Sequence, residues 1–325
     1  MKLEFWGTRG SIPTPSGKTP YQKEIVTNKY GGNTTCMRII GDDNSEHIID
    51  AGTGIRELGA HLGLRDGKEG SKTNLYFTHT HWDHIQGLPF FGPAYNPNSD
   101  IKIFAEAKVK YDLGNTILGH SEYNTNGEPV ERKVMMIEGP GIKNVLMNQQ
   151  TQRNFPVPLE VLKGIKSYYD FVPGTTLGTN GVNIETFPLN HPGGCVGYKI
   201  KNEKGIIVIT TDFEQGDEEK DNLLKKMVEN ADVWVCDGQY ENGSQKNPFI
   251  KGWGHSDPFY NLNVALETGV KKMIVTHHEP KMNDDYHTDL EERVRQYTHE
   301  RLNARNLKDD GLKVYLAKEG DVYNL

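Results

Sequence analysis

The chain has 325 residues, a formal net charge of −7 and three scattered cysteines, Cys36, Cys195 and Cys236. This length allows one large α/β domain or two ordinary ones, and the negative charge argues against tight, sequence-independent binding to nucleic acid. Isolated cysteines fit neither a disulfide framework nor a cysteine-based zinc site. The sequence contains no run of about 18 apolar residues that would predict a membrane span. We therefore expect a soluble, cytoplasmic protein without a membrane partner or a stable nucleic-acid complex.

The first hundred residues contain short β-rich runs bounded by Gly, Pro, Asn or Asp, which predict strands. The expected strands cover residues 2–7, 34–41, 46–52, 74–80 and 100–107. A helical pattern follows the third of these strands and covers residues 54–64.

A second series of strands follows after residue 170. The expected strands cover residues 181–190, 195–202, 204–212, 231–238, 271–278 and 312–317, and the expected helices cover residues 218–231, 258–269 and 288–305. The last helix carries Thr288 and Glu291 at the spacing of an N-terminal capping box. Two strand-rich series, each accompanied by helices, predict an α/β fold in which helices cover the outer faces of sheets.

The pattern weakens between about residues 110 and 170, which we interpret as an insertion within a single domain that covers residues 1–325. This segment contains seven basic and seven acidic residues, so its charge is balanced. A neutral segment binds RNA poorly, because affinity for phosphate depends mainly on clustered Lys and Arg. We expect the segment to cover a site or to contact a second subunit, as in a homodimer.

The stretch "LYFTHTHWDHIQGLPFF", residues 75–91, places four potential metal ligands directly after a predicted strand. These residues are His79, His81, Asp83 and His84. Neutral imidazole nitrogen and carboxylate oxygen are the donors that zinc and related divalent ions prefer. The His-x-His-x-Asp-His spacing therefore predicts a metal site on the turn that leaves this strand.

This motif resembles the signature of the metallo-β-lactamase fold. The resemblance implies a four-layer αββα sandwich that holds two divalent ions, with Zn²⁺ expected and Mn²⁺ or Fe²⁺ as alternatives. It also implies further ligands at later strand ends, namely His191, Asp212 as the carboxylate shared by both ions, and His277. We prefer His277 to its neighbour His278 as the ligand, because His277 directly follows a predicted strand. His278 is then expected to contact substrate or to support a ligand.

Other stretches resemble the branch of this family that contains ribonuclease Z and the class II cyclic-nucleotide phosphodiesterases. They are "FWGTRGSIPTP" at residues 5–15, "KYGGNTTC" at residues 29–36, "WVCDGQY" at residues 234–240 and "GWGHSDP" at residues 252–258. Asn33 and Thr34 of the second stretch are expected to orient the metal-binding loop and to contact substrate, although an ordinary buried turn explains them equally well.

Asp237 and His255 resemble the paired acid and histidine of that branch, which often carries Glu where this chain has Asp237. Two closely spaced divalent ions can activate water and stabilise the charge of a displacement at phosphorus. We expect Asp83 to orient the attacking water as well as to bind metal. His255, oriented by Asp237, is expected to protonate the leaving alkoxide.

The expected substrate is a small phosphodiester, most plausibly a cyclic nucleotide. Ribonuclease Z grips RNA with an arm that commonly lies between the ligands matched by His191 and Asp212, and here two short strands fill that interval. Some phage and bacterial proteins of this neighbourhood degrade the cyclic-nucleotide signals of anti-phage defence. The alternatives are a ribonuclease Z-like endonuclease, a lactone or thioester hydrolase, and a non-catalytic nucleotide-binding protein. Redox chemistry at a di-iron site is disfavoured, because such relatives typically have Glu where this chain has His81.

Overall fold

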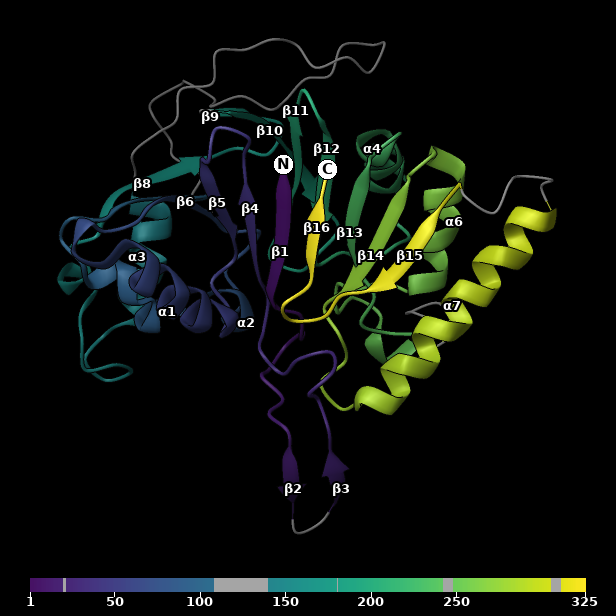
Figure 1. The fold of residues 1–325 in the computed structure, drawn as a ribbon, viewed down its shortest axis with the longest axis horizontal. Helices are drawn as coiled ribbons and strands as arrows, with labels where there is room; N and C mark the ends of the chain where they lie inside the picture. The colour runs from purple at the N-terminus through teal and green to yellow at the C-terminus, as the bar shows by residue number, and fades with distance from the viewer. Residues whose placement is uncertain (20–21, 108–139, 180, 242–247, 305–310) are drawn as a thin grey trace.

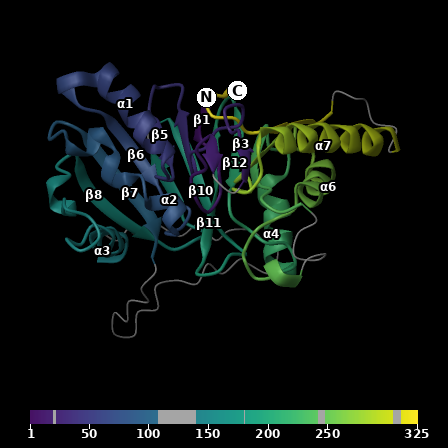
Figure 2. The same cartoon turned by 90° about the horizontal axis from the view of Figure 1, so that it is seen from below.

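Two β-sheets pack face to face, and helices cover the outer face of each sheet (Figures 1 and 2). The computed structural model describes residues 1–19, 22–107, 140–179, 181–241, 248–304 and 311–325. This arrangement confirms the predicted four-layer αββα sandwich.

Within the described residues, each sheet has seven strands. The first sheet has the spatial order β16 (Val322–Asn324), β1 (Lys2–Gly7), β4 (Cys36–Ile40), β5 (Glu46–Ile49), β6 (Lys72–Tyr76), β7 (Asp100–Glu106) and β8 (Ile165–Phe171). The second has the order β15 (Lys313–Leu316), β14 (Lys272–Thr276), β13 (Val233–Asp237), β12 (Gly205–Thr210), β11 (Cys195–Asn202), β10 (Val182–Leu189) and β9 (Thr176–Thr179). Strands β5 to β8 are parallel, as are β12 to β15, so each sheet presents a row of carboxyl ends at one edge.

The helices divide between the two outer faces. The first sheet carries α1 (Gly54–Asp66), α2 (Trp82–Ile85) and α3 (Pro140–Gln149), and the second carries α4 (Glu218–Val228), α6 (Pro258–Thr268) and α7 (Asp284–Ala304). Short 3₁₀ segments are η1 (Gly67–Glu69), η2 (Leu88–Phe90), η3 (Gly92–Tyr95), η4 (Leu159–Val161) and η5 (Pro248–Ile250). A two-stranded ribbon of β2 (Gly17–Thr19) and β3 (Gln22–Ile25) projects from the sandwich (Figure 1).

The apolar runs of the central strands are explained by burial on both faces of each sheet. In β12, Ile207 and Ile209 pack between the two sheets, whereas Val208 packs under the helices of the second sheet. Successive side chains of a strand point to opposite faces, so a strand that is covered on both sides needs apolar residues at every position. The packing therefore accounts for "GIIVIT" as a buried strand.

The structure corrects the predicted start of the last helix. α7 begins at Asp284, and Thr288 lies inside the helix with its hydroxyl donating to the carbonyl of Asp284 at 2.8 Å. The carboxylate of Asp284 accepts hydrogen bonds from the backbone N–H groups of Lys29 and Tyr30 at 2.7 and 3.2 Å. A contact distant in sequence therefore anchors the first turn, and the Thr288–Glu291 spacing does not mark a capping box.

The segment interpreted as an insertion lies only partly within the described residues, because residues 108–139 fall outside them. Its later part contributes α3 to the outer face of the first sheet. It also contributes β8, which pairs in parallel with β7 at the edge of that sheet. The weak pattern did not predict this strand.

None of the helices in the described part of the chain is both long enough and apolar enough to cross a membrane.

Gly197 of β11 lies opposite Phe187 of β10, and a Cβ on Gly197 would lie 2.4 Å from the phenyl ring. Because this ring is fully buried, Gly197→Ala should destabilise the protein by about 1–3 kcal/mol through overpacking. Gly178→Ala on β9 is the matched control, since its Cβ would meet no atom within 4 Å. Urea unfolding should separate the two variants, and equal stabilities would contradict the packing argument.

Candidate metal centre

The predicted ligands gather where strands of both sheets end. His79 and His81 follow β6 of the first sheet, and α2 carries Asp83 and His84 immediately afterwards. In the second sheet, the ligand candidates His191, Asp212 and His277 follow β10, β12 and β14, respectively. These strands all run in the same direction within their sheets, so their carboxyl ends meet at one edge and bring residues from distant parts of the sequence together.

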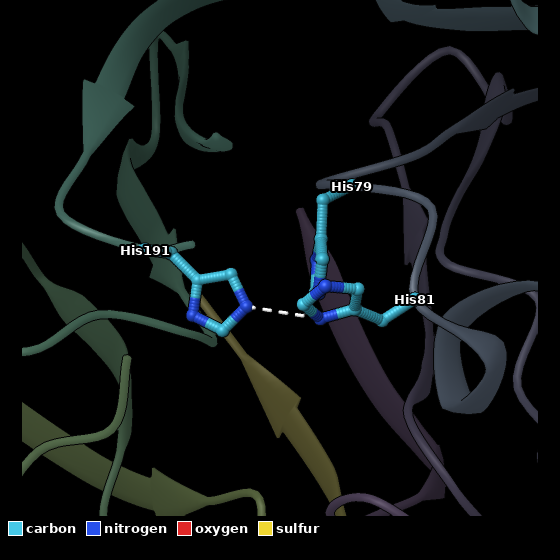
Figure 3. A group of neighbouring side chains, drawn as sticks. All are labelled: His79, His81 and His191. Atoms are coloured by element: carbon cyan, nitrogen blue, oxygen red, sulfur yellow. Dashed lines mark hydrogen bonds between the residues drawn. The ribbon is translucent and has the colours of Figure 1, made fainter. Parts of the chain in front are cut away.

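Three histidines form the first group, in which the nearest ring nitrogens all lie within 4.8 Å of one another (Figure 3). The group contains His79, His81 and His191. Nε2 of His191 lies 3.1 Å from Nδ1 of His81, while Nδ1 of His191 is 2.9 Å from the carbonyl oxygen of Gly254. That carbonyl can only accept, so Nδ1 of His191 carries the proton and Nε2 presents a lone pair to the group.

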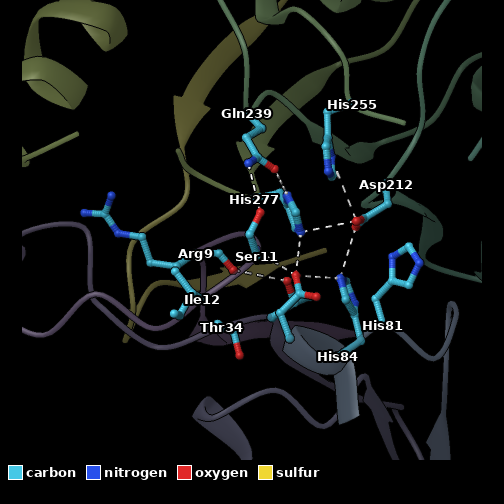
Figure 4. A network of polar contacts seen from close by, with 12 residues as sticks. Arg9, Ser11, Ile12, Thr34, His81, His84, Asp212, Gln239, His255 and His277 are labelled. Carbon is cyan, nitrogen blue, oxygen red and sulfur yellow. Dashed lines mark hydrogen bonds and ion pairs between the residues drawn. The ribbon is translucent and has the colours of Figure 1, made fainter. Parts of the chain in front are cut away.

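The second group contains Asp83, His84, Asp212 and His277 (Figure 4). Nε2 of His277 lies 3.1 Å from Oδ2 of Asp83 and 3.2 Å from Oδ2 of Asp212, and Nε2 of His84 lies 3.3 Å from Oδ1 of Asp212. Oδ2 of Asp212 is also 3.8 Å from Nε2 of His79 in the first group. Asp212 therefore lies between the two groups.

Several atoms of these groups are buried without a hydrogen-bond partner among the residues that the structure describes. They are Nε2 of His79, Nε2 of His84 and Oδ1 of Asp212. Burying a polar atom without a partner is unfavourable, and such atoms in a native protein call for an explanation. Imidazole nitrogens and a carboxylate oxygen that converge in this way fit a bound divalent cation.

The electrostatics of the groups are consistent with a cation site. Burial lowers the pKa of His79 well below its ordinary value and lowers the pKa of His191 to about 4, which keeps both rings in the neutral form that binds metal. Burial also lowers the pKa of His277, but Asp212, Asp83 and Asp237 together outweigh this effect and raise the pKa to about 9. Although burial favours protonated Asp212, His277 and His84 hold its pKa well below the usual range. A cation could supply the positive charge that the protonated rings otherwise provide.

Asp50 supports the second group and was not recognised from the sequence. Its carboxylate accepts hydrogen bonds from the backbone N–H and the hydroxyl of Thr78, both at 2.8 Å, and lies 2.8 Å from Nδ1 of His84. This contact fixes the proton on Nδ1 and turns Nε2 of His84 toward the group. Asp50 follows β5 with a positive φ of 62°, and its place at a strand end in "IIDAGTG" is the signal that could have identified it.

Gln239 and Ser11 also hold the second group in place. Oε1 of Gln239 lies 2.8 Å from Nδ1 of His277, and the backbone N–H of Ser11 donates to Oδ2 of Asp83 at 2.8 Å. On the other side of the centre, Glu214 accepts from the backbone N–H groups of Gly252 and Gly254, which positions the carbonyl that contacts the first group.

Asp237 and His255 lie beside the metal-ligand candidates. Nδ1 of His255 is 2.7 Å from Oδ2 of Asp237, and the His255 ring stacks on His277 with centroids 4.8 Å apart. The donor atoms of this pair, Asp212 and His277 are close enough together to form a third potential metal group. The short contact to Asp237 commits Nδ1 of His255 to a proton and leaves Nε2 as the other nitrogen of that ring.

The three residues expected to contact substrate have other partners in the structure. His278 is 1% exposed, and its Nε2 lies 2.8 Å from the carbonyl oxygen of Ala317. Asn33 donates to Glu319 through both its backbone and its side chain, and the hydroxyl of the fully buried Thr34 accepts from Gln86 and from the backbone of Thr53. These contacts are those of buried turns, which leave His278 and Thr34 no surface for a substrate.

A pocket of about 420 Å³ opens over the candidate centre. Its lining consists of Ser11, Thr80, His81, Trp82, Asp83, Asp212 and His255. Trp82 is 82% exposed although it stands between two ligand candidates in the sequence. The pocket therefore combines polar groups with a large exposed aromatic surface.

The model of the beta-lactamase superfamily domain matches residues 47–278 of this chain. The chain therefore belongs to the metallo-β-lactamase superfamily of hydrolases. Ribonuclease Z from Streptococcus gordonii is 21% identical over 326 residues, which cover 85% of this chain and 89% of that protein.

Two solved structures illustrate the shared fold. Zn²⁺-bound PqqB from Methylobacterium extorquens superposes with a TM-score of 0.62 at 14% identity and covers 100% of both chains. A diphosphatase from the PhnP family superposes with a TM-score of 0.58 at 16% identity, covering 100% of this chain and 97% of that one. These likenesses extend over the whole sandwich, and we take from them the fold alone.

Asp50→Asn should weaken metal binding, because the amide no longer holds the Nδ1 proton of His84 as the carboxylate does. Loss of such a supporting contact typically costs about 10–100-fold in metal affinity. Competition with a chromogenic chelator would measure the change, and Asp43→Asn on an exposed turn is the matched control. Unchanged affinity in Asp50→Asn would remove Asp50 from the support of the centre.

Proposed function

We propose that this protein is a dinuclear metal-dependent phosphodiesterase whose substrate is a small phosphodiester of the cyclic-nucleotide class. The observation that carries the proposal is the Asp237–His255 pair, which lies beside the two ligand groups and whose histidine lines the pocket over them. A phosphodiester expels an alkoxide, which needs a proton, and a histidine held by a carboxylate can supply it.

In this proposal His79, His81 and His191 would hold one ion, and Asp83, His84 and His277 would hold the other. Asp212, which lies between the two groups, would serve as a ligand for both. Zn²⁺ suits the mixture of nitrogen and oxygen donors, and Mn²⁺ and Fe²⁺ are alternatives. When bound, the ions would lower the pKa of water and offset negative charge on the phosphoryl group.

The residues of the chain then have distinct tasks. The backbone N–H of Ser11 donates to one oxygen of Asp83 and so fixes the orientation of the carboxylate. In that orientation Asp83 would position the attacking water as well as a metal ion. Asp237 accepts a hydrogen bond from the Nδ1–H group of His255. Nε2 is therefore the nitrogen that can deliver a proton to the leaving oxygen.

The surroundings of the pocket support a nucleotide substrate. A volume of about 420 Å³ is in the range of small-ligand sites. Trp82 lines this pocket. The half-exposed Trp253 lies 6.1 Å from Tyr240 between ring centroids, and Tyr240 lies 5.7 Å from His255 of the pocket lining. Stacking of a base on an aromatic side chain contributes about 1–3 kcal/mol.

A ribonuclease Z-like activity is the second candidate, favoured by the name of the Streptococcus gordonii relative. Against it, the interval between His191 and Asp212 contains only β11, β12 and their turns, which leaves no arm there to grip RNA. The net charge of −7 also disfavours a long polyanion.

The proposal is tested by incubating the metal-loaded protein with a panel of cyclic mono- and dinucleotides and with a precursor transfer RNA. Chromatography of the products should show ring opening of at least one cyclic nucleotide at a rate far above that of RNA cleavage. Accurate and efficient 3′ processing of the precursor, with no cyclic nucleotide hydrolysed, would establish the second candidate instead.

His255→Ala should lower kcat by about 10² to 10⁴, the range for loss of a general acid, while the metal content stays the same. The loss should shrink for a nitrophenyl phosphodiester, because nitrophenolate departs without a proton. Asp237→Ala should show the same selectivity in milder form, and His61→Ala on α1 is the matched control. If His255→Ala slows both substrates equally or loses metal, His255 is a structural residue and the acid assignment is wrong.

A further inference from the structure

Ser11 occupies a strained turn that is packed against the candidate centre. Its φ is 57°, a left-handed conformation that non-glycine residues seldom adopt. The preceding Gly10 lets this turn approach the centre, since a Cβ on Gly10 would lie 2.4 Å from Nδ1 of His277. The backbone N–H of Ser11 donates to Asp83, and the residue lines the pocket. Strain of this kind is found where the surrounding structure holds a functional group in place.

The direction of the Ser11 hydroxyl follows from a chain of hydrogen bonds that starts at His277 (Figure 4). Oε1 of Gln239 lies 2.8 Å from Nδ1 of His277, and an amide oxygen can only accept, so Nδ1 carries a proton and donates to Gln239. The amide group of Gln239 is thereby oriented with its nitrogen toward Ser11.

The amide nitrogen can only donate, and it lies 3.0 Å from Oγ of Ser11 and 3.1 Å from the hydroxyl of Tyr240. Oγ of Ser11 therefore accepts from Gln239, and its own proton remains available. Among the residues that the structure describes, no hydrogen bond uses that proton. The hydroxyl lies on the pocket lining beside His81, Asp212 and His255, where an anionic group would accept it.

We propose that Ser11 is a catalytic residue whose hydroxyl donates a hydrogen bond to a non-bridging oxygen of the phosphoryl group. This inference rests on the proposed phosphodiesterase function and assigns a donor for its substrate. Gln239 acts as a positioning residue, because its amide holds Oγ as an acceptor and so directs the hydroxyl proton to the pocket. Ser11 is a donor rather than a nucleophile, since the group that contacts Oγ is itself a donor and cannot remove a proton.

The test measures the affinity of the metal-loaded protein for inorganic phosphate by titration calorimetry. Ser11→Ala keeps the backbone N–H that holds Asp83 and removes only the hydroxyl. It should weaken phosphate binding about tenfold or more, the usual effect of losing a hydrogen bond to a charged group. Ser11→Gly also lacks the hydroxyl but tolerates the positive φ, and it should show the same loss. Ser16→Ala is the matched control, because its hydroxyl contacts Thr27 and Asn28.

Gln239→Glu tests the positioning role through a double-mutant cycle. The carboxylate accepts from both His277 and Ser11, so it draws the serine proton away from the pocket. Adding Ser11→Ala to Gln239→Glu should therefore weaken phosphate binding much less than Ser11→Ala does in the wild-type protein. Additive losses would contradict the proposed coupling.

Metal content and thermal unfolding of each variant distinguish the remaining outcomes. Wild-type phosphate affinity in Ser11→Ala, or loss of metal from that variant, would overturn the assignment of Ser11 as a phosphoryl donor. If the phosphodiesterase proposal itself is wrong, the result is different. The wild-type protein would then hydrolyse no member of the cyclic-nucleotide panel, regardless of how tightly it binds phosphate.

Discussion

The carboxylate of Asp212 is the group on which the candidate centre depends. It is almost fully buried where β12 ends, and it lies within 3.3 Å of ring nitrogens of both His84 and His277 and 3.8 Å from His79. A buried carboxylate is stable only when positive charge or hydrogen-bond donors surround it. The protein places histidines from both sheets around this one residue, and the same arrangement suits two divalent ions that share an oxygen-donating ligand.

The sandwich provides this geometry because parallel strands end together. Each half of the molecule contributes ligand candidates from its own strand ends, and a set of hydrogen bonds then fixes the rings. Asp50 holds His84, Gln239 holds His277 and the carbonyl of Gly254 holds His191. In each case the contact places the proton on Nδ1, so that Nε2 is the nitrogen presented to the centre. The rigid strands and these contacts together determine which atom of each ligand is available.

The sequence predicted the parts of this arrangement that leave a local pattern. The apolar runs of the central strands reflect burial on both faces, and the motif that contains Asp83 concentrates metal-binding side chains on one turn. Edge strands such as β8 and β16 leave a weaker pattern, because they have fewer neighbours and half-exposed side chains. The start of α7 depends on a contact between Asp284 and residues more than 250 positions earlier, which no local spacing reveals.

The supporting residues were harder to predict than the ligand candidates, because their roles also depend on contacts that no local pattern reveals. Asp50 and Gln239 contact ligand candidates that lie 34 and 38 positions away in the chain, and neither belongs to a cluster of similar side chains. For His278 the local pattern was misleading. Its position beside a ligand candidate suggested a role at the site, but its side chain is buried against the carbonyl of Ala317. β14 ends at Thr276, and His277 follows it with a positive φ of 60°; at this turn His277 faces the centre, whereas His278 contacts Tyr30 and Ala317.

The central claim is that Asp212 joins two metal sites in one centre. Elemental analysis of protein purified gently and then supplied with Zn²⁺ or Mn²⁺ tests it most directly. We expect about two metal ions per chain and a value near one after His191→Ala, because in the proposed centre that change removes a ligand of only one ion. A reproducible value near one in the wild-type protein, with no gain on adding either ion, would contradict the dinuclear centre.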